Sequence, residues 1–131
     1  MQKHLPNDRE IFEGKLGTYW LGEEGILYSV STKTRRTLEN VNENIALVKR
    51  ITNNKKACLI VYVAPSPVPD KQTRDFVANE LPNIYKAMAI VSKGGLGKVI
   101  MNILFKLNSP LIPMKTFSNE NEAKEWIRQY L

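Results

Sequence analysis

The sequence has only one cysteine and one histidine, and this scarcity argues against disulfides, metal sites and histidine-based catalysis. Cys58 is the single cysteine of 131 residues, so the chain has no disulfide framework and no cysteine-based metal site. His4 lies in a polar N-terminal stretch, where it cannot anchor a catalytic triad or a metal site. The acidic residues are scattered, and no two carboxylates have a spacing that indicates acid–base catalysis. We therefore predict a protein that is not an enzyme and that holds no metal or cofactor.

The sequence also lacks long apolar segments. Its first ten residues, M-Q-K-H-L-P-N-D-R-E, are polar, unlike a signal peptide. No stretch of about 18 uncharged apolar residues occurs, so we predict no membrane span and a reducing, cytoplasmic setting. A length of 131 residues is typical of one domain. We predict a loose tail over 1–9 and a single domain over 10–131.

Basic residues exceed acidic ones, which gives a formal net charge of +6. Such an excess suits nucleic acid or another acidic partner, and basic clusters occur within 32–37 and 49–56. No aromatic residues interleave with either cluster, as binding to single strands would require. No known DNA-binding module is present. The sequence therefore disfavours nucleic acid as a partner and favours a solvated basic surface.

Apolar patterns predict a β-hairpin followed by alternating helices and strands. Two apolar, β-branched runs flank the turn G-E-E-G, which predicts a hairpin over 18–30. Residues 12–16 extend its first arm or add a strand. Thr37 suits the N-cap of a helix whose apolar residues recur every three or four positions, up to Asn53. The continuous apolar run 57–63 is typical of a strand buried on both faces of a sheet.

The second half continues the alternation. The predicted elements are a helix over 70–81 that Pro82 closes or kinks, a strand over 86–91, a helix over 96–107, a strand over 111–117 that Pro113 pushes to a sheet edge, and a last helix capped by Asn119. Strands that alternate with helices indicate an α/β or α+β domain. We predict a hairpin followed by βα units, with a mixed, mostly parallel sheet and about four helices.

Two stretches resemble a known family. A-M-A-I-V-S at 87–92 runs into a predicted helix, and P-L-I-P-M-K-T-F-S-N-E-N-E-A-K-E-W-I at 110–127 is similar to a closing strand and helix of the form F-x-x-x-x-x-A-x-x-W-L/I. With the element order, they resemble the SpoIIAA-like, or STAS, fold over most of 10–131, and in particular small bacterial STAS/SEC14-like proteins of unknown function. The resemblance implies a non-enzymatic regulatory module. Anti-sigma-factor antagonists of this fold are switched by phosphorylation of a serine at the head of the second helix, and related members are proposed to bind nucleotides, lipids or partner domains.

Ser66 is the residue that could match that regulatory serine. The family pattern is D-S-x-G, whereas the loop here reads A-P-S-P-V-P-D, with no aspartate before the serine and no glycine after it. Because Pro69 disfavours a helical Val68, the helix is expected to start at Asp70, which leaves Ser66 in a stiff loop outside it. Three interpretations stay open for Ser66: a structural loop residue, the rim of a ligand site, and a phosphoacceptor.

Two basic stretches next to predicted helix starts are candidate anion or ligand sites. Near the helix over 70–81, the candidates are Ser66, Lys71 and Arg74. The turn S-K-G-G-L-G-K does not match a P-loop, but its backbone N–H groups suit an anion. Its alternative role is a tight turn that needs glycine. The candidates in this turn are Ser92, Lys93, Gly94, Gly95 and Lys98.

The helix predicted over 96–107 is apolar around most of its circumference. Its few polar residues lie on one stripe of roughly 80° at 100° per residue. Met101 and Phe105 flank this stripe and are candidate interface residues for a homodimer, a protein partner or a lipid. Burial within the monomer is the alternative.

These features lead to two functional hypotheses. The first is a regulatory or protein-interaction module of STAS-like type that acts through the apolar surface of 96–107. The second is a small-ligand or lipid-binding protein with a cleft between the loop 64–70, the turn 92–97 and the helix 96–107.

Overall fold

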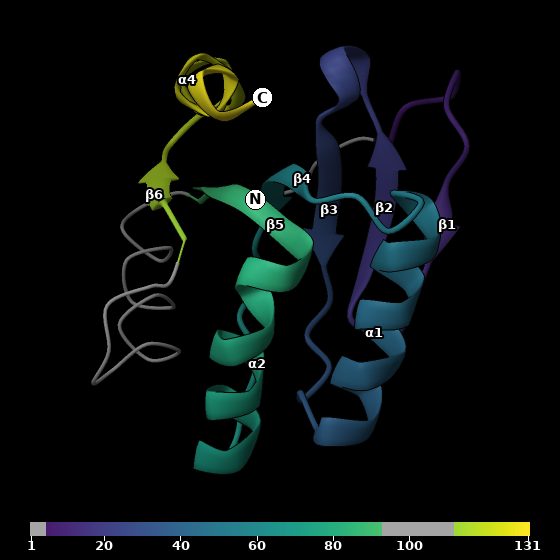
Figure 1. The fold of residues 1–131 in the computed structure, drawn as a ribbon, viewed down its shortest axis with the longest axis vertical. Helices are drawn as coiled ribbons and strands as arrows, with labels where there is room; N and C mark the ends of the chain where they lie inside the picture. Colours follow the sequence, from purple (N-terminus) through teal and green to yellow (C-terminus); the bar gives the residue numbers. More distant parts are fainter. Residues whose placement is uncertain (1–4, 93–111) are drawn as a thin grey trace.

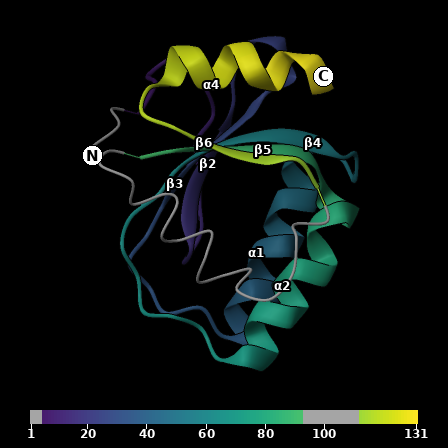
Figure 2. The same cartoon turned by 90° about the vertical axis from the view of Figure 1, so that its left-hand side faces the viewer.

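A six-stranded sheet forms the centre of the molecule, and helices lie on both of its faces. The computed structural model describes residues 5–92 and 112–131. In order across the sheet, the strands are β1 (Phe12–Glu13), β2 (Gly17–Leu21), β3 (Leu27–Ser31), β4 (Ala57–Tyr62), β5 (Tyr85–Val91) and β6 (Met114–Phe117). The α-helices of the described residues are α1 (Leu38–Ile51), α2 (Lys71–Ile84) and α4 (Glu120–Ile127). Figure 1 shows the strands side by side, and Figure 2 shows α1 and α2 on one face and α4 on the other.

The sheet is mixed and mostly parallel, as the sequence predicts. β1, β2 and β3 pair in antiparallel fashion, while β3, β4, β5 and β6 are parallel to one another. The predicted hairpin over 18–30 is confirmed, and its turn holds Gly25 at a φ of 75°. Glycine adopts this left-handed conformation without steric cost. The helix predicted over 96–107 lies outside the described residues.

Local capping sets the starts of the α-helices. The Thr37 side chain accepts a hydrogen bond of 3.2 Å from the Asn40 N–H, and the Asn40 side chain accepts one of 2.8 Å from the Thr37 N–H. Asp70 caps α2 and Asn119 caps α4 through side-chain oxygens. All three caps agree with the sequence prediction, and such a cap contributes about 1 kcal/mol. Because Asp70 is the cap, Ser66 lies in the loop before α2.

The predicted end of the second helix is three residues too early. α2 continues through Pro82 to Ile84, although proline lacks the N–H that a helix interior uses. Pro82 lies in the last turn, and the Tyr85 N–H closes that turn on the Leu81 carbonyl. Leu81 and Ile84 are both buried against the sheet, so packing outweighs the local penalty.

The last strand is also shorter than predicted. β6 begins at Met114, after Pro113, instead of at 111. It ends the strand order of the described sheet, so the predicted edge position is confirmed. The Pro113 carbonyl still accepts a hydrogen bond of 2.9 Å from the Met88 N–H. Proline has no N–H to donate, but it is tolerated here because its hydrogen bond to β5 uses only the carbonyl.

Candidate ligand-binding pocket

A cavity of about 230 Å³ lies between the sheet and the helices α1 and α2. Its lining includes residues that follow the ends of β3 and β4, in the loops 32–37 and 63–70. Because β3 and β4 are parallel, both loops leave the same edge of the sheet. In sheets of this kind, ligands bind beyond the carboxyl ends of the strands. The position in the fold therefore suits a binding site.

The sheet supplies an apolar floor. Leu59 pairs with Met88, and Met88 pairs with Met114, so these three side chains form one row across β4, β5 and β6. Val61 and Ile90 form a parallel row two residues further along the strands. Alternate residues of a strand point to the same face, which directs both rows toward α1 and α2. Apolar side chains of these two helices form the walls: Val41, Ile45, Val77, Leu81 and Ile84.

A polar cluster lies at the end of the cavity where α1 faces β2 and β3. Asn44 Nδ2 donates a hydrogen bond of 2.8 Å to the Tyr19 hydroxyl, which also bonds with Ser29 and Tyr85. Burial raises the pKa of Tyr19 and outweighs the lowering by these bonds. Burial likewise raises the pKa of Tyr85 well above its usual range. Both phenols stay neutral, and the cluster satisfies most of its own polar groups.

Asn44 also separates the cavity from a second one. Its Oδ1 atom is buried and has no hydrogen-bond partner among the described residues. The second cavity measures about 190 Å³ and is lined by Asn44, Glu13, Lys15 and Glu43 among others. Lys15 and Glu43 form an ion pair of 3.5 Å whose side chains are both largely exposed. This second cavity is a charged surface hollow, in which Lys15 pairs with Glu43 and Glu13 adds a further negative charge.

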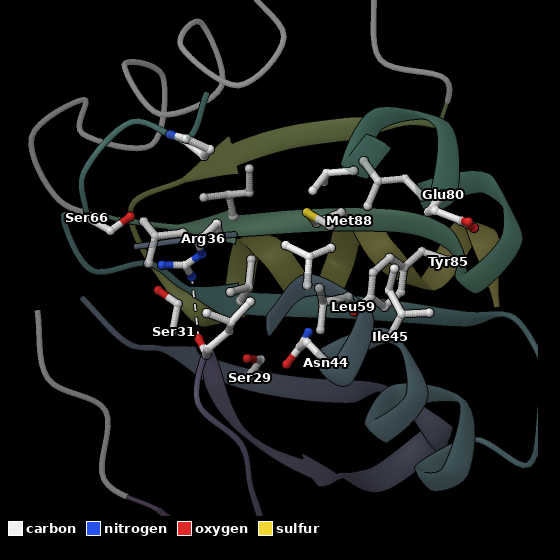
Figure 3. Close-up of a pocket in the computed structure, with 18 of the residues that line it drawn as sticks. Ser29, Ser31, Arg36, Asn44, Ile45, Leu59, Ser66, Glu80, Tyr85 and Met88 are labelled. Atoms are coloured by element: carbon white, nitrogen blue, oxygen red, sulfur yellow. Dashed lines mark hydrogen bonds between the residues drawn. The ribbon is translucent and has the colours of Figure 1, made fainter. Parts of the chain in front are cut away.

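Arg36 supplies a positive charge at the other end of the pocket (Figure 3). Its Nη1 donates to the carbonyls of Thr32 and Thr34 at 3.0 and 2.9 Å, and its Nη2 donates to the Leu16 carbonyl at 3.4 Å. No carboxylate of residues 5–92 and 112–131 forms an ion pair with this guanidinium. Burial lowers the pKa of Arg36, but a guanidinium stays charged at neutral pH. The pocket thus holds a half-buried cation whose hydrogen bonds within the described residues all go to neutral carbonyls.

Two serines lie at the same end as Arg36 in Figure 3. The Ser31 Oγ accepts a hydrogen bond of 2.8 Å from the Ala64 N–H, which leaves its O–H group to donate. Ser66 is exposed and belongs to the lining of the cavity, in the loop that Pro67 and Pro69 stiffen. This position agrees with one of the three interpretations of Ser66, the rim of a ligand site. Its role as a phosphoacceptor stays a prediction.

The other predicted site residues lie away from this cavity or outside the described residues. Lys71 pairs with Asp75 at 2.8 Å on the exposed side of α2. Arg74 donates a bond of 2.8 Å to the Pro69 carbonyl and so supports the loop before α2. Ser92 is buried, and its N–H bonds to the Phe117 carbonyl at 2.9 Å. The remaining candidates lie outside the described residues: Lys93, Gly94, Gly95, Lys98, Met101 and Phe105.

Apart from Ser66, sequence reasoning missed the polar residues of the pocket. Asn44 had a recognisable signal, because it lies three residues after Val41 and four before Val48, on the apolar stripe of α1. A polar residue on such a stripe indicates a buried polar contact. Arg36 had no such signal, because a basic residue next to a helix cap is common on protein surfaces.

The described residues form neither a metal-binding cluster nor a membrane-spanning helix. Within the described residues, no group of three or more His, Cys, Asp or Glu side chains could hold a metal ion. Across the same part of the chain, every helix is too short or too polar to cross a membrane.

Comparisons with known proteins give a family and no more. The model of a family described as "Domain of unknown function (DUF7793)" matches residues 19–131. No curated protein and no solved structure matches the chain. The matched range includes both rows of the pocket floor, the polar cluster and Arg36.

Proposed function

This chain belongs to the DUF7793 family, and we propose that it is a binding module for a small amphiphilic molecule. The observation that supports this most is the cavity itself, an apolar space of about 230 Å³ with a cation at one end. Sites for small molecules are typically concave and mostly apolar, with a few fixed polar groups. Here burial of the ligand's apolar part against the floor would supply most of the binding energy, and the polar groups of the cavity would orient the ligand.

Binding without catalysis is the reading that the side chains favour. Apart from Glu80, the polar side chains of the described lining are hydroxyls, one amide and one guanidinium, and none of them is a good base at neutral pH. Glu80 is the carboxylate of the lining, but it accepts a bond of 2.9 Å from Asn83, and Figure 3 shows it pointing away from the cavity. A bound molecule would therefore meet groups that hold it, and we propose a carrier or sensor instead of an enzyme.

This proposal develops the second of the two sequence hypotheses. The loop 64–70 contributes to the lining of the cavity, as that hypothesis requires, whereas the turn 92–97 lies outside the described residues except for Ser92. The first hypothesis, a STAS-like regulatory module acting through Met101 and Phe105, depends on residues outside the described part of the chain. It stays a prediction, as do the homodimer and the cytoplasmic location.

Calorimetric titration with straight-chain alcohols tests the proposal. Each CH₂ group that enters an apolar site contributes about 0.8 kcal/mol, or roughly a fourfold gain in affinity. The affinity should therefore rise from 1-hexanol to 1-octanol and stop rising once the cavity is full. Native mass spectrometry should show one molecule bound per chain. Absence of binding by the whole series would contradict the proposal.

A variant that fills the cavity locates the site. Met88→Trp places a larger side chain in the middle of the floor, so the affinity for 1-octanol should fall at least about tenfold. Lys115→Trp is the matched control, because Lys115 is exposed on the neighbouring strand β6. It adds the same aromatic group outside the cavity. Equal binding by both variants would show that alcohols bind elsewhere.

A further inference from the structure

We infer that the pocket selects a monocarboxylate, with the carboxylate held by Arg36 and the Ser31 hydroxyl and the apolar part lying along the sheet. This inference rests on the proposed function, because it names the class of ligand for the same cavity. It goes beyond that function by assigning a head group, a size and two recognition residues. None of these features follows from an apolar cavity alone.

Arg36 is held ready for an anion. Its guanidinium is held by three carbonyls. Two belong to the loop after β3 (Thr32 and Thr34), and one belongs to Leu16, just before β2. Holding the side chain in place before binding lowers the entropy that is lost when a ligand arrives. A cation that neutral oxygens alone contact is stabilised further when an anion binds beside it. The position of Arg36 therefore favours a negatively charged group in the pocket.

The donors that remain on Arg36 match a carboxylate. A guanidinium has five N–H groups, and the three bonds of Arg36 leave Nε–H and one N–H of Nη2 within the described structure. These two nitrogens lie on the same side of the planar group. If the Leu16 carbonyl takes the Nη2 hydrogen nearer Nη1, the other Nη2 hydrogen and Nε–H form a fork that binds both oxygens of a carboxylate. The Ser31 O–H lies at the same end of the cavity and supplies a third donor (Figure 3).

The charge of the site fits a single negative charge. Arg36 is the cation of the described lining, while its neighbour Arg35 lies outside it. Lys71 pairs with Asp75, and neither Lys71 nor Arg74 belongs to the described lining. A phosphate monoester carries up to two negative charges and three acceptor oxygens, so it would leave charge unmatched here. A carboxylate is the head group that the available donors satisfy.

The volume of the cavity limits the rest of the ligand. An apolar cavity of about 150 Å³ takes up benzene, so about 230 Å³ holds roughly nine carbon-sized atoms. The floor offers these atoms methionine and aliphatic side chains, including Leu59, Val61 and Met88. The phenols of Tyr19 and Tyr85 already bond within their own cluster. The ligand class is therefore a medium-chain or single-ring carboxylic acid with an apolar tail.

A head-group series on the unmodified protein is the first test. Octanoate, 1-octanol, octylammonium and octyl phosphate share one tail, so their dissociation constants compare the head groups alone. Octanoate should bind at least about tenfold more tightly than 1-octanol, the usual effect of a charge-assisted hydrogen bond, and octylammonium should bind most weakly. Tighter binding of octyl phosphate would overturn the choice of carboxylate.

An arginine variant with a matched control is the second test. Arg36→Gln should remove the preference for octanoate, so that the ratio of the two dissociation constants falls to about one. Arg35→Gln removes the same charge from an exposed neighbour and should leave both affinities unchanged. Ser31→Ala should weaken octanoate by a smaller factor. An octanoate preference that survives in Arg36→Gln would overturn the inference.

A measurement on the unmodified protein covers the case that Arg36→Gln fails to fold. With octanoate labelled with ¹³C at its carboxyl carbon, the bound signal should titrate at a lower pH than the free signal, because a neighbouring cation favours the charged form. A bound signal that titrates at the same pH or higher would overturn the inference. The outcomes also separate the two proposals: failure of 1-octanol and octanoate alike refutes the pocket, whereas equal binding of both refutes only the carboxylate.

Discussion

The two faces of the sheet are packed in different ways, although the same strands build them. Under α4, the strands present Ile60, Ala87 and Ala89, each with no exposed surface, and the helix adds Ala123 and Ile127, which are equally buried. On the face toward α1 and α2, the same strands present methionines and branched residues. Val61, Met88 and Met114 among them are only half-buried. The cavity lies on this second face.

The difference arises from side-chain size at alternate positions. Small alanines in β5 and α4 let the helix approach the sheet closely, so the side chains that remain fill the space between them. The α1 and α2 face combines methionine and branched residues with polar groups such as Asn44, which need specific partners. The face under α4 therefore contributes mainly to stability, whereas the face under α1 and α2 is packed less completely and contains the cavity.

The same substitution on both faces is the strongest test of this contrast. Ile127→Ala should lower the free energy of unfolding by about 2–5 kcal/mol, the range for buried residues whose loss leaves a cavity. Ile45→Ala, on α1 beside the existing cavity, should cost only about 1 kcal/mol because that side chain is half-buried. Urea denaturation of the two variants measures both values. Equal losses would show that the two faces are packed equally well.

Enlarging neighbouring side chains in β5 tests the contrast from the other direction. Ala89→Met adds volume to the filled face and should destabilise the protein by about 1–3 kcal/mol. Met88→Trp adds volume next to the cavity and should change stability by less than about 1 kcal/mol while it blocks the ligand. Thermal unfolding of both proteins without ligand provides the comparison. The contrast would be wrong if Met88→Trp destabilised the protein more than Ala89→Met.

The pH dependence of stability should also differ between the helices of the two faces, although by a smaller amount. The α2 cap Asp70 titrates, whereas the α4 cap Asn119 does not. Hydrogen bonds from Thr73 hold the pKa of Asp70 below its usual value, so its contribution is present above the unfolded value of about 3.9 and is lost as the pH falls through the folded value. Asp70→Asn should therefore show a weaker loss of stability between pH 5 and 2.5. Urea midpoints across this range measure it, and Asn119→Ser, with unchanged acid dependence, is the control.

Short-range interactions explain what could be predicted. Thr37, Asp70 and Asn119 cap their helices through bonds to residues only three positions away. Gly25 turns the hairpin through its own backbone conformation. The end of α2 was predicted less well, because the packing of Ile84 against the sheet outweighs the local effect of Pro82.

The pocket could not be predicted in the same way. Its floor was foreseeable as apolar strands, but its polar ends depend on contacts between distant parts of the chain. Asn44 meets Tyr19 across 25 positions, and Arg36 meets the Leu16 carbonyl across 20. The predicted candidates Lys71 and Arg74 lie near a helix start, as basic residues often do; Lys71 pairs with Asp75 within α2, and Arg74 bonds the Pro69 carbonyl of the preceding loop.

The amino-acid order alone determines most elements of the described structure, their caps and the face that each apolar residue takes, because these depend on neighbours within a few positions. It also limits the chemistry, since Cys58 and His4 offer so few reactive groups. The site was decided by the tertiary structure, which sets β2 beside β3 and β3 beside β4 in one register. That register brings Leu16, Ser31 and Arg36 to one end of a cavity. Thr32 and Thr34 hold the Arg36 guanidinium from nearby in the sequence, whereas the Leu16 carbonyl is 20 positions away and only the folded chain brings it to Arg36.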